Sequence, residues 1–118
     1  MSADRLISYL KHMGQASYTP PKVYDDGFDY GEITFRTKVS IADNLQKLIN
    51  QELTPANGVE AHIEFIDIQV HDDQHRTYKA VIIPYQDPKA MTQRDLEKVT
   101  DAYLRRLPKV LRNIRQKY

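Results

Sequence analysis

Residues 59–70 read VEAHIEFIDIQV, and this stretch decides the fold. Apolar and polar residues alternate as far as Phe65, which is the pattern of a strand with one buried face. From Ile66 onward the apolar residues take the opposite phase. A β-bulge near Phe65–Ile66 would restore one buried face, because a slip of one residue otherwise turns every later side chain over. The stretch therefore predicts a long, half-buried strand that contains a bulge.

The segments around this strand predict an antiparallel sheet. Residues 71–76, HDDQHR, are typical of a turn, and residues 77–85 would pair back as a hairpin with Pro84 at a strand end or sheet edge. Residues 32–39, EITFRTKV, alternate in the same way and predict a third strand. Residues 15–31 contain Pro20-Pro21, two glycines and three tyrosines, and we interpret them as a long loop.

Three segments have the apolar spacing of helices. The first is 2–13, with Ser2 as its N-cap, and the second follows Ser40, with Asp43 completing a capping box and Asn57-Gly58 ending the segment. The third begins near Thr92 and carries apolar residues at steps of three and four: Leu96, Val99, Tyr103, Leu107, Val110, Ile114 and Tyr118. Pro108 lies inside it and predicts a kink or a break.

Together these segments predict a single α+β domain over residues 1–118. The predicted order is α-β-α-β-β-α, with a three-stranded antiparallel sheet, helices packed on one face, and a long kinked C-terminal helix. The length of 118 residues suits one domain, and the 41% of hydrophobic residues suit a globular chain.

Composition excludes several function classes. The chain has no cysteine, which rules out a disulfide framework, a thiolate nucleophile and the usual structural zinc sites. No apolar run reaches the length of a membrane span, so we expect no membrane partner and a cytoplasmic location. No glycine-rich phosphate loop and no nucleophile elbow is present, so we predict a non-enzymatic protein without a cofactor.

The formal net charge of +1 hides an uneven distribution. Residues 1–104 carry 11 basic and 16 acidic side chains, a formal charge of −5, whereas residues 105–118 carry only basic ones, a formal charge of +6. On a helical wheel three of these basic residues lie opposite the apolar stripe and three lie on its flanks. The candidate binding residues are Arg105, Arg106, Lys109, Arg112, Arg115 and Lys117. Such a face can neutralise phosphates or meet an acidic protein surface, but it can equally be a solvated helix face.

The aspartates support a second interpretation. His71, Asp72, Asp73 and His75 gather at one turn, where imidazole and carboxylate groups could bind a divalent metal, although such residues are also ordinary in turns. The run Asp43–Lys47, followed by Asp72-Asp73, is loosely similar to the acidic motifs of RusA-type Holliday-junction resolvases. That resemblance implies a magnesium-dependent nuclease with Asp43, Asp72 and Asp73 as metal ligands and Lys47 at the phosphate. Ile41 stands where the family has another aspartate, and helix capping and turn formation also explain these residues.

Three functions therefore remain open. The first is a binding or assembly module whose basic C-terminal helix contacts nucleic acid or an acidic protein surface. The second is the small nuclease. The third is a structural subunit of a homo-oligomer, because a final helix of 27 residues would be about 40 Å long and part of its apolar stripe could meet another chain.

Overall fold

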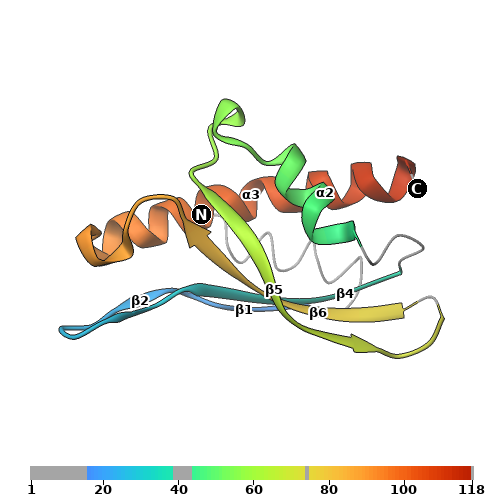
Figure 1. Ribbon diagram of the computed structural model, residues 1–118, viewed down its shortest axis with the longest axis horizontal. Coiled ribbons are helices and arrows are strands. Elements are labelled where there is room, and N and C mark those ends of the chain that lie inside the picture. The colour runs from blue at the N-terminus through green and yellow to red at the C-terminus, as the bar shows by residue number, and fades with distance from the viewer. Residues whose placement is uncertain (1–15, 39–43, 74, 118) are drawn as a thin grey trace.

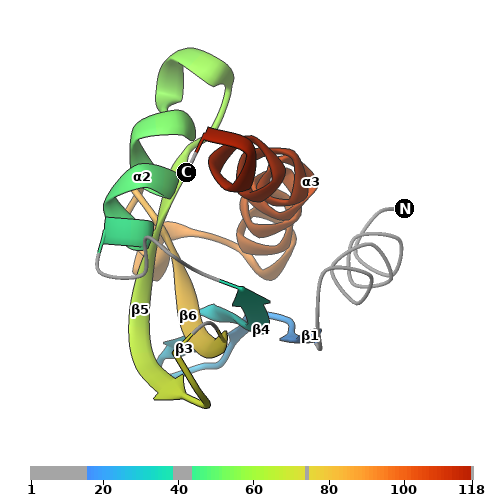
Figure 2. The same cartoon turned by 90° about the vertical axis from the view of Figure 1, so that its right-hand side faces the viewer.

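A computed structural model describes residues 16–38, 44–73 and 75–117. Within them a sheet lies on one side and two helices lie together on the other (Figure 1, Figure 2). The strands are β1 (Ala16–Thr19), β2 (Lys22–Val23), β3 (Phe28–Asp29), β4 (Gly31–Lys38), β5 (Ala61–Val70) and β6 (His75–Pro84). The helices are α2 (Leu45–Glu52) and α3 (Gln93–Lys117), with short 3-10 turns at Pro55–Asn57 and Pro88–Ala90. The predicted helix over 2–13 lies outside the described residues, as does Asp43.

The predicted α+β class with an antiparallel sheet and a long C-terminal helix is confirmed, but the strand count is wrong. The main sheet has four strands in the order β1-β4-β6-β5, all antiparallel, and β2 and β3 form a separate two-stranded ribbon. The segment 15–31, which the sequence predicts to be a loop, supplies β1, β2 and β3, so the described order is not α-β-α-β-β-α. Strands this short carry no periodic signal of their own, and pairing with β4 is what orders β1.

The bulge in β5 is confirmed. Phe65 pairs with Ala80 and Asp67 pairs with Lys79, so Ile66 is the extra residue. After the bulge Ile68 pairs with Tyr78, which is fully buried, and this pairing returns Ile68 to the helix side of the sheet. Phe35, Phe65 and Tyr78 form an aromatic cluster on that side, with ring centroids 4.7–6.3 Å apart. The bulge therefore keeps one apolar face along the whole strand, as the change of phase indicated.

The long helix α3 closes the core over this face. Its buried residues include Leu96, Tyr103, Leu104 and Leu107, all without exposed surface, and Val110, Leu111 and Ile114 continue the same stripe. Thr92 Oγ1 accepts a hydrogen bond from Asp95 N at 3.1 Å, as expected of an N-cap. The helix runs uninterrupted through Pro108, so a break there is wrong. Among the described residues of the stripe all but the half-buried Val99 are buried by the chain itself, so these residues do not require another chain to cover them.

A second helix, α2, covers the free edge of β5 with amide side chains. Asn50 Nδ2 donates to Ile63 O at 2.9 Å, and Asn50 Oδ1 accepts from Ile63 N at 3.0 Å. Gln46 Oε1 accepts from Phe65 N at 2.7 Å. These side chains replace the hydrogen bonds that a neighbouring strand would make, because backbone groups at a sheet edge otherwise lack partners.

We predict that Asn50→Ala lowers the free energy of unfolding by about 2 kcal/mol, because it leaves the Ile63 amide and carbonyl without their partner. The measurement is urea denaturation followed by circular dichroism. Gln51→Ala is the matched control, since Gln51 is exposed one position further along α2. Equal losses of unfolding free energy in the two variants would show that the hydrogen bonds of Asn50 to Ile63 do not stabilise the fold.

Close packing also fixes the position of β4 against α3. A Cβ added to Gly31 would lie 2.6 Å from Thr100 Cγ2, well inside van der Waals contact. Thr100 is buried, and its hydroxyl donates to Leu96 O at 2.8 Å, so its side chain has little room to move. Glycine is therefore required at this position by the distance between strand and helix.

Gly31→Ala is expected to destabilise the fold by about 1–3 kcal/mol through overpacking. Because Thr100→Ser removes the methyl group that the new Cβ would meet, the double variant should recover part of the loss in a thermal unfolding experiment. If the effects of the two substitutions were simply additive, this contact would not be the cause.

Candidate functional site

The exposed face of α3 carries a row of basic residues that is longer than the sequence interpretation proposed. Arg105, Lys109 and Arg112 are exposed, as expected from the wheel. Arg94 and Lys98 are also exposed and precede them on the same face. At 3.6 residues per turn the five side chains fall within about 60° of arc and extend over about 27 Å. We call Arg94, Lys98, Arg105, Lys109 and Arg112 the basic row.

Sequence reasoning missed Arg94 and Lys98 because acidic residues surround them and because Pro108 was expected to divide the helix. Their spacing was the available signal. Positions 94, 98, 105, 109 and 112 differ by four, seven, four and three, which keeps them on one side of an unbroken helix. Since α3 is continuous, the helical spacing of these residues is not interrupted at Pro108.

The other predicted basic residues lie elsewhere or are not described. Arg106 is exposed, but it lies on the flank of α3 near the 3-10 turn that follows α2. There its Nη1 donates to Ala102 O at 3.3 Å, and its Nη2 would be 3.3 Å from a Cβ added to Gly58. Arg115 and Lys117 belong to α3, but their side chains lie outside the described part of the structure. Of the six candidates the structure therefore places three in the basic row.

Acidic residues form one flank of α3, beside β1. Gln93 Nε2 donates to Glu97 Oε1 at 2.7 Å and to Pro21 O at 2.9 Å, and Gln93 Oε1 accepts from Val23 N at 2.6 Å. These bonds attach the β2–β3 ribbon to the start of α3. The negative charge of Glu97 is therefore held on the side that faces the sheet edge, away from the centre of the basic row.

Burial and neighbouring charge change the titration of this acidic flank. Burial raises the pKa of the Asp101 carboxyl, the charge of Glu97 raises it further, and Arg105 opposes both. Burial also raises the pKa of the Tyr18 hydroxyl, with further contributions from Asp101 and Glu97. Tyr18 therefore stays a protonated hydrogen-bond donor across the physiological range, in an acidic environment.

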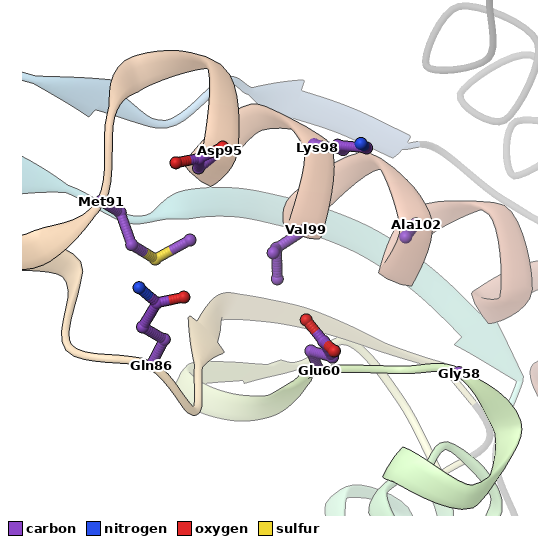
Figure 3. A pocket seen from close by; sticks show the side chains of 8 residues that line it. All are labelled: Gly58, Glu60, Gln86, Met91, Asp95, Lys98, Val99 and Ala102. Carbon is purple, nitrogen blue, oxygen red and sulfur yellow. The ribbon is translucent and has the colours of Figure 1, made fainter.

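A surface groove lies between α3 and the ends of β5 and β6 (Figure 3). It has a volume of about 390 Å³, and Val99 and Glu60 point toward each other across it. Its lining residues are Gly58, Glu60, Gln86, Met91, Asp95, Lys98, Val99 and Ala102. Five of these eight are exposed. Small-molecule sites usually enclose their ligand and fix it with a few buried polar groups, so this groove is a poor candidate for a catalytic or cofactor site.

The aspartates of the nuclease interpretation are not brought into a described metal site. Asp72 serves the β5–β6 turn, where its Oδ1 accepts from His75 N at 2.8 Å and lies 2.9 Å from His75 Nδ1. His71 Nε2 forms a hydrogen bond with Thr77 Oγ1 at 2.6 Å. Over residues 16–38, 44–73 and 75–117, no three His, Asp or Glu side chains lie close enough together to hold a metal ion. Asp43, the third proposed ligand, is outside these ranges.

Comparisons with protein-family models, with curated proteins and with solved structures find no match to this chain. None of the helices described here is long and apolar enough to cross a membrane. Function must therefore be argued from the arrangement of the side chains.

We predict that Asp101→Asn stabilises the protein at pH 7 and has little effect at pH 3. A carboxyl whose pKa is higher in the folded than in the unfolded chain stabilises the fold below its ordinary pKa of 3.8, and this contribution is lost as the pH rises through the folded pKa. Removing the charge of Asp101 therefore stabilises the fold only at pH 7. The measurement is the urea midpoint as a function of pH, with Asp26→Asn in the exposed turn as the control. An equal gain at both pH values would contradict this assignment.

Proposed function

We propose that this protein is a non-enzymatic binding module whose basic row contacts the phosphates of a nucleic acid. The observation that carries the proposal is the alignment of Arg94, Lys98, Arg105, Lys109 and Arg112 on one exposed face of an unbroken helix. A row of cations of this kind displaces condensed counterions from a polyanion, and this release drives salt-dependent binding. We place this activity in the cytoplasm, in keeping with the sequence prediction.

The dimensions of the basic row favour a regular polyanion over a single charged ligand. Its length of about 27 Å corresponds to roughly 8 base pairs of duplex at 3.4 Å per step. The five charges project from one continuous helix, so the backbone that carries them is already ordered before binding. The neighbouring acidic flank limits the basic surface to one side of α3, which would set the orientation of the bound strand.

Binding would be independent of base sequence. The basic row offers arginine and lysine to phosphates, whereas the aromatic ring of Tyr103 in α3 is fully buried and cannot stack on a base. An acidic protein surface is the other class of partner that the sequence suggested. It would require a spacing of carboxylates matched to the row, whereas phosphates supply a regular spacing of their own.

We predict that the protein binds a labelled duplex of mixed sequence with a strong salt dependence. If all five side chains contact phosphates, log K against log salt concentration has a slope of about −4 to −5. Arg105→Ala combined with Lys109→Ala should weaken binding and reduce the magnitude of the slope by about 2. Fluorescence anisotropy over about 50 to 200 mM salt measures both quantities.

The matched control is Lys22→Ala combined with Lys89→Ala, which removes the same charge from exposed positions outside α3. Equal effects of the two double variants would mean that only net charge matters and would overturn the assignment to the basic row. Binding to an acidic protein but to no duplex or single strand would favour the alternative partner. Cleavage of the labelled strand in magnesium, lost on Asp72→Ala, would instead support the nuclease.

A further inference from the structure

The free edge of β5 is covered over only half of its length. β5 is an outer strand of the four-stranded sheet, and α2 caps it at Ile63 and Phe65 through Asn50 and Gln46. α2 begins at Leu45, and no side-chain cap of this kind is described beyond Phe65. Within the part of the chain that the structure describes, the half from Ile66 to Val70 therefore lies past the end of the helical cover.

The backbone of this second half faces outward at two positions. Along a strand, the backbone amide and carbonyl groups of every second residue face the free edge. The hydrogen bonds from α2 show that Ile63 and Phe65 are such residues. The bulge adds one residue, so the alternation resumes at Ile68 and Val70. Their amide and carbonyl groups are thus available to pair with a further strand.

Apolar surface coincides with this open edge. Of the five large apolar side chains that are strongly exposed in the described residues, three lie here: Ile66 at 53%, Ile68 at 45% and Val70 at 64%. Proteins usually protect a free edge with lysine, with proline or by keeping the strand short. β5 is 10 residues long and has neither lysine nor proline, so the bulge and Asp67 are its own edge protection in this half. Neither of them covers the exposed apolar side chains, which a partner strand would cover.

We propose that a second copy of this chain supplies that strand, with β5 pairing antiparallel to β5 of its partner about a two-fold axis at Ile68. In this register Ile68 faces its own symmetry mate, and Ile66 lies opposite Val70 of the other copy. The charges favour the same register, because Asp67 lies opposite Gln69 and no like charges face each other over residues 66–70. An isologous contact of this kind uses the same surface twice and closes on itself.

The pairing also explains where assembly stops. It joins two four-stranded sheets into one of eight strands, with β1 as the outer strand at both ends. β1 has only four residues, and short edge strands resist further pairing. Five residues from each copy form a small contact, below the roughly 1,200 Å² of stable complexes, so we expect dissociation in the micromolar range or weaker. This interface lies on the sheet edge and does not depend on the basic row.

The absence of native cysteine allows a direct test. Paired residues in an antiparallel sheet have Cα atoms about 5.5 Å apart, which is within the range of a disulfide. In the full chain, Ile68→Cys should therefore form a covalent dimer under a glutathione redox buffer, and Ser17→Cys on β1 should not.

Two results of this experiment would overturn the proposal. One is a covalent dimer of the Ser17→Cys variant. The other is the absence of a covalent dimer of the Ile68→Cys variant, and protection of its thiol from a thiol reagent would then show that the chain's own residues cover the edge.

A second variant tests the interface without cross-linking. Ile68→Lys places two positive charges across the axis and introduces an edge-protecting residue, so it should abolish the dimer in sedimentation velocity up to about 500 µM. Thr19→Lys on β1 adds the same charge and should leave the dimer intact. Both positions are exposed, so both variants should remain folded. A parent chain that stays monomeric over this range would contradict the proposal, whatever its nucleic-acid binding.

Discussion

The burial of one side of α3 against the sheet is the constraint on which the rest of the structure depends. Leu96, Tyr103, Leu104 and Leu107 lose all exposed surface in this contact, and a large apolar side chain contributes about 1.5–3 kcal/mol when it is fully buried. Once this side is fixed, helical geometry leaves no freedom in what the opposite side presents to water. The basic row is therefore oriented by the hydrophobic core on the far side of the same helix.

The same contact explains the close approach of strand and helix on the β1 side. Gly31 gives Thr100 room to pack against β4, and Gln93 binds the β2–β3 ribbon through two backbone groups. These contacts bring Tyr18 beside Glu97 and Asp101, and burial there raises the pKa of both Tyr18 and Asp101. One flank of α3 thus carries the exposed Glu97 and the half-buried Asp101, whereas the outer side carries the basic row. Asp101 lies where the two meet, because the charge of Arg105 acts on its pKa.

On the other side of the molecule, the sheet extends further than the helices that cover it. α2 is only eight residues long, and its amide side chains reach β5 no further than Phe65. The bulge keeps Ile68 and Val70 on the helix side of the sheet, but no described helix lies over them. The mismatch between a 10-residue strand and an eight-residue helix therefore leaves apolar side chains and an open strand edge together. A partner strand at this edge would cover both.

The sequence by itself determined the elements with a strong period: the strand over 59–70 with its bulge, the hairpin that follows it, the strand over 32–39, and the long amphipathic C-terminal helix. Side-chain alternation reports burial directly, so these could be predicted from the residues alone. Only the tertiary structure decided that residues 16–19 form a fourth strand, since four residues become ordered through hydrogen bonds to β4 and not through their own propensity. It also decided that the helix passes Pro108 unbroken, because packing on both sides of the proline outweighs one lost hydrogen bond. Because the helix is continuous, Arg94 and Lys98 belong to the same basic row as Lys109 and Arg112. The open half of β5 was beyond prediction for the same reason: exposure depends on where α2 ends in space, and no local pattern encodes that distance.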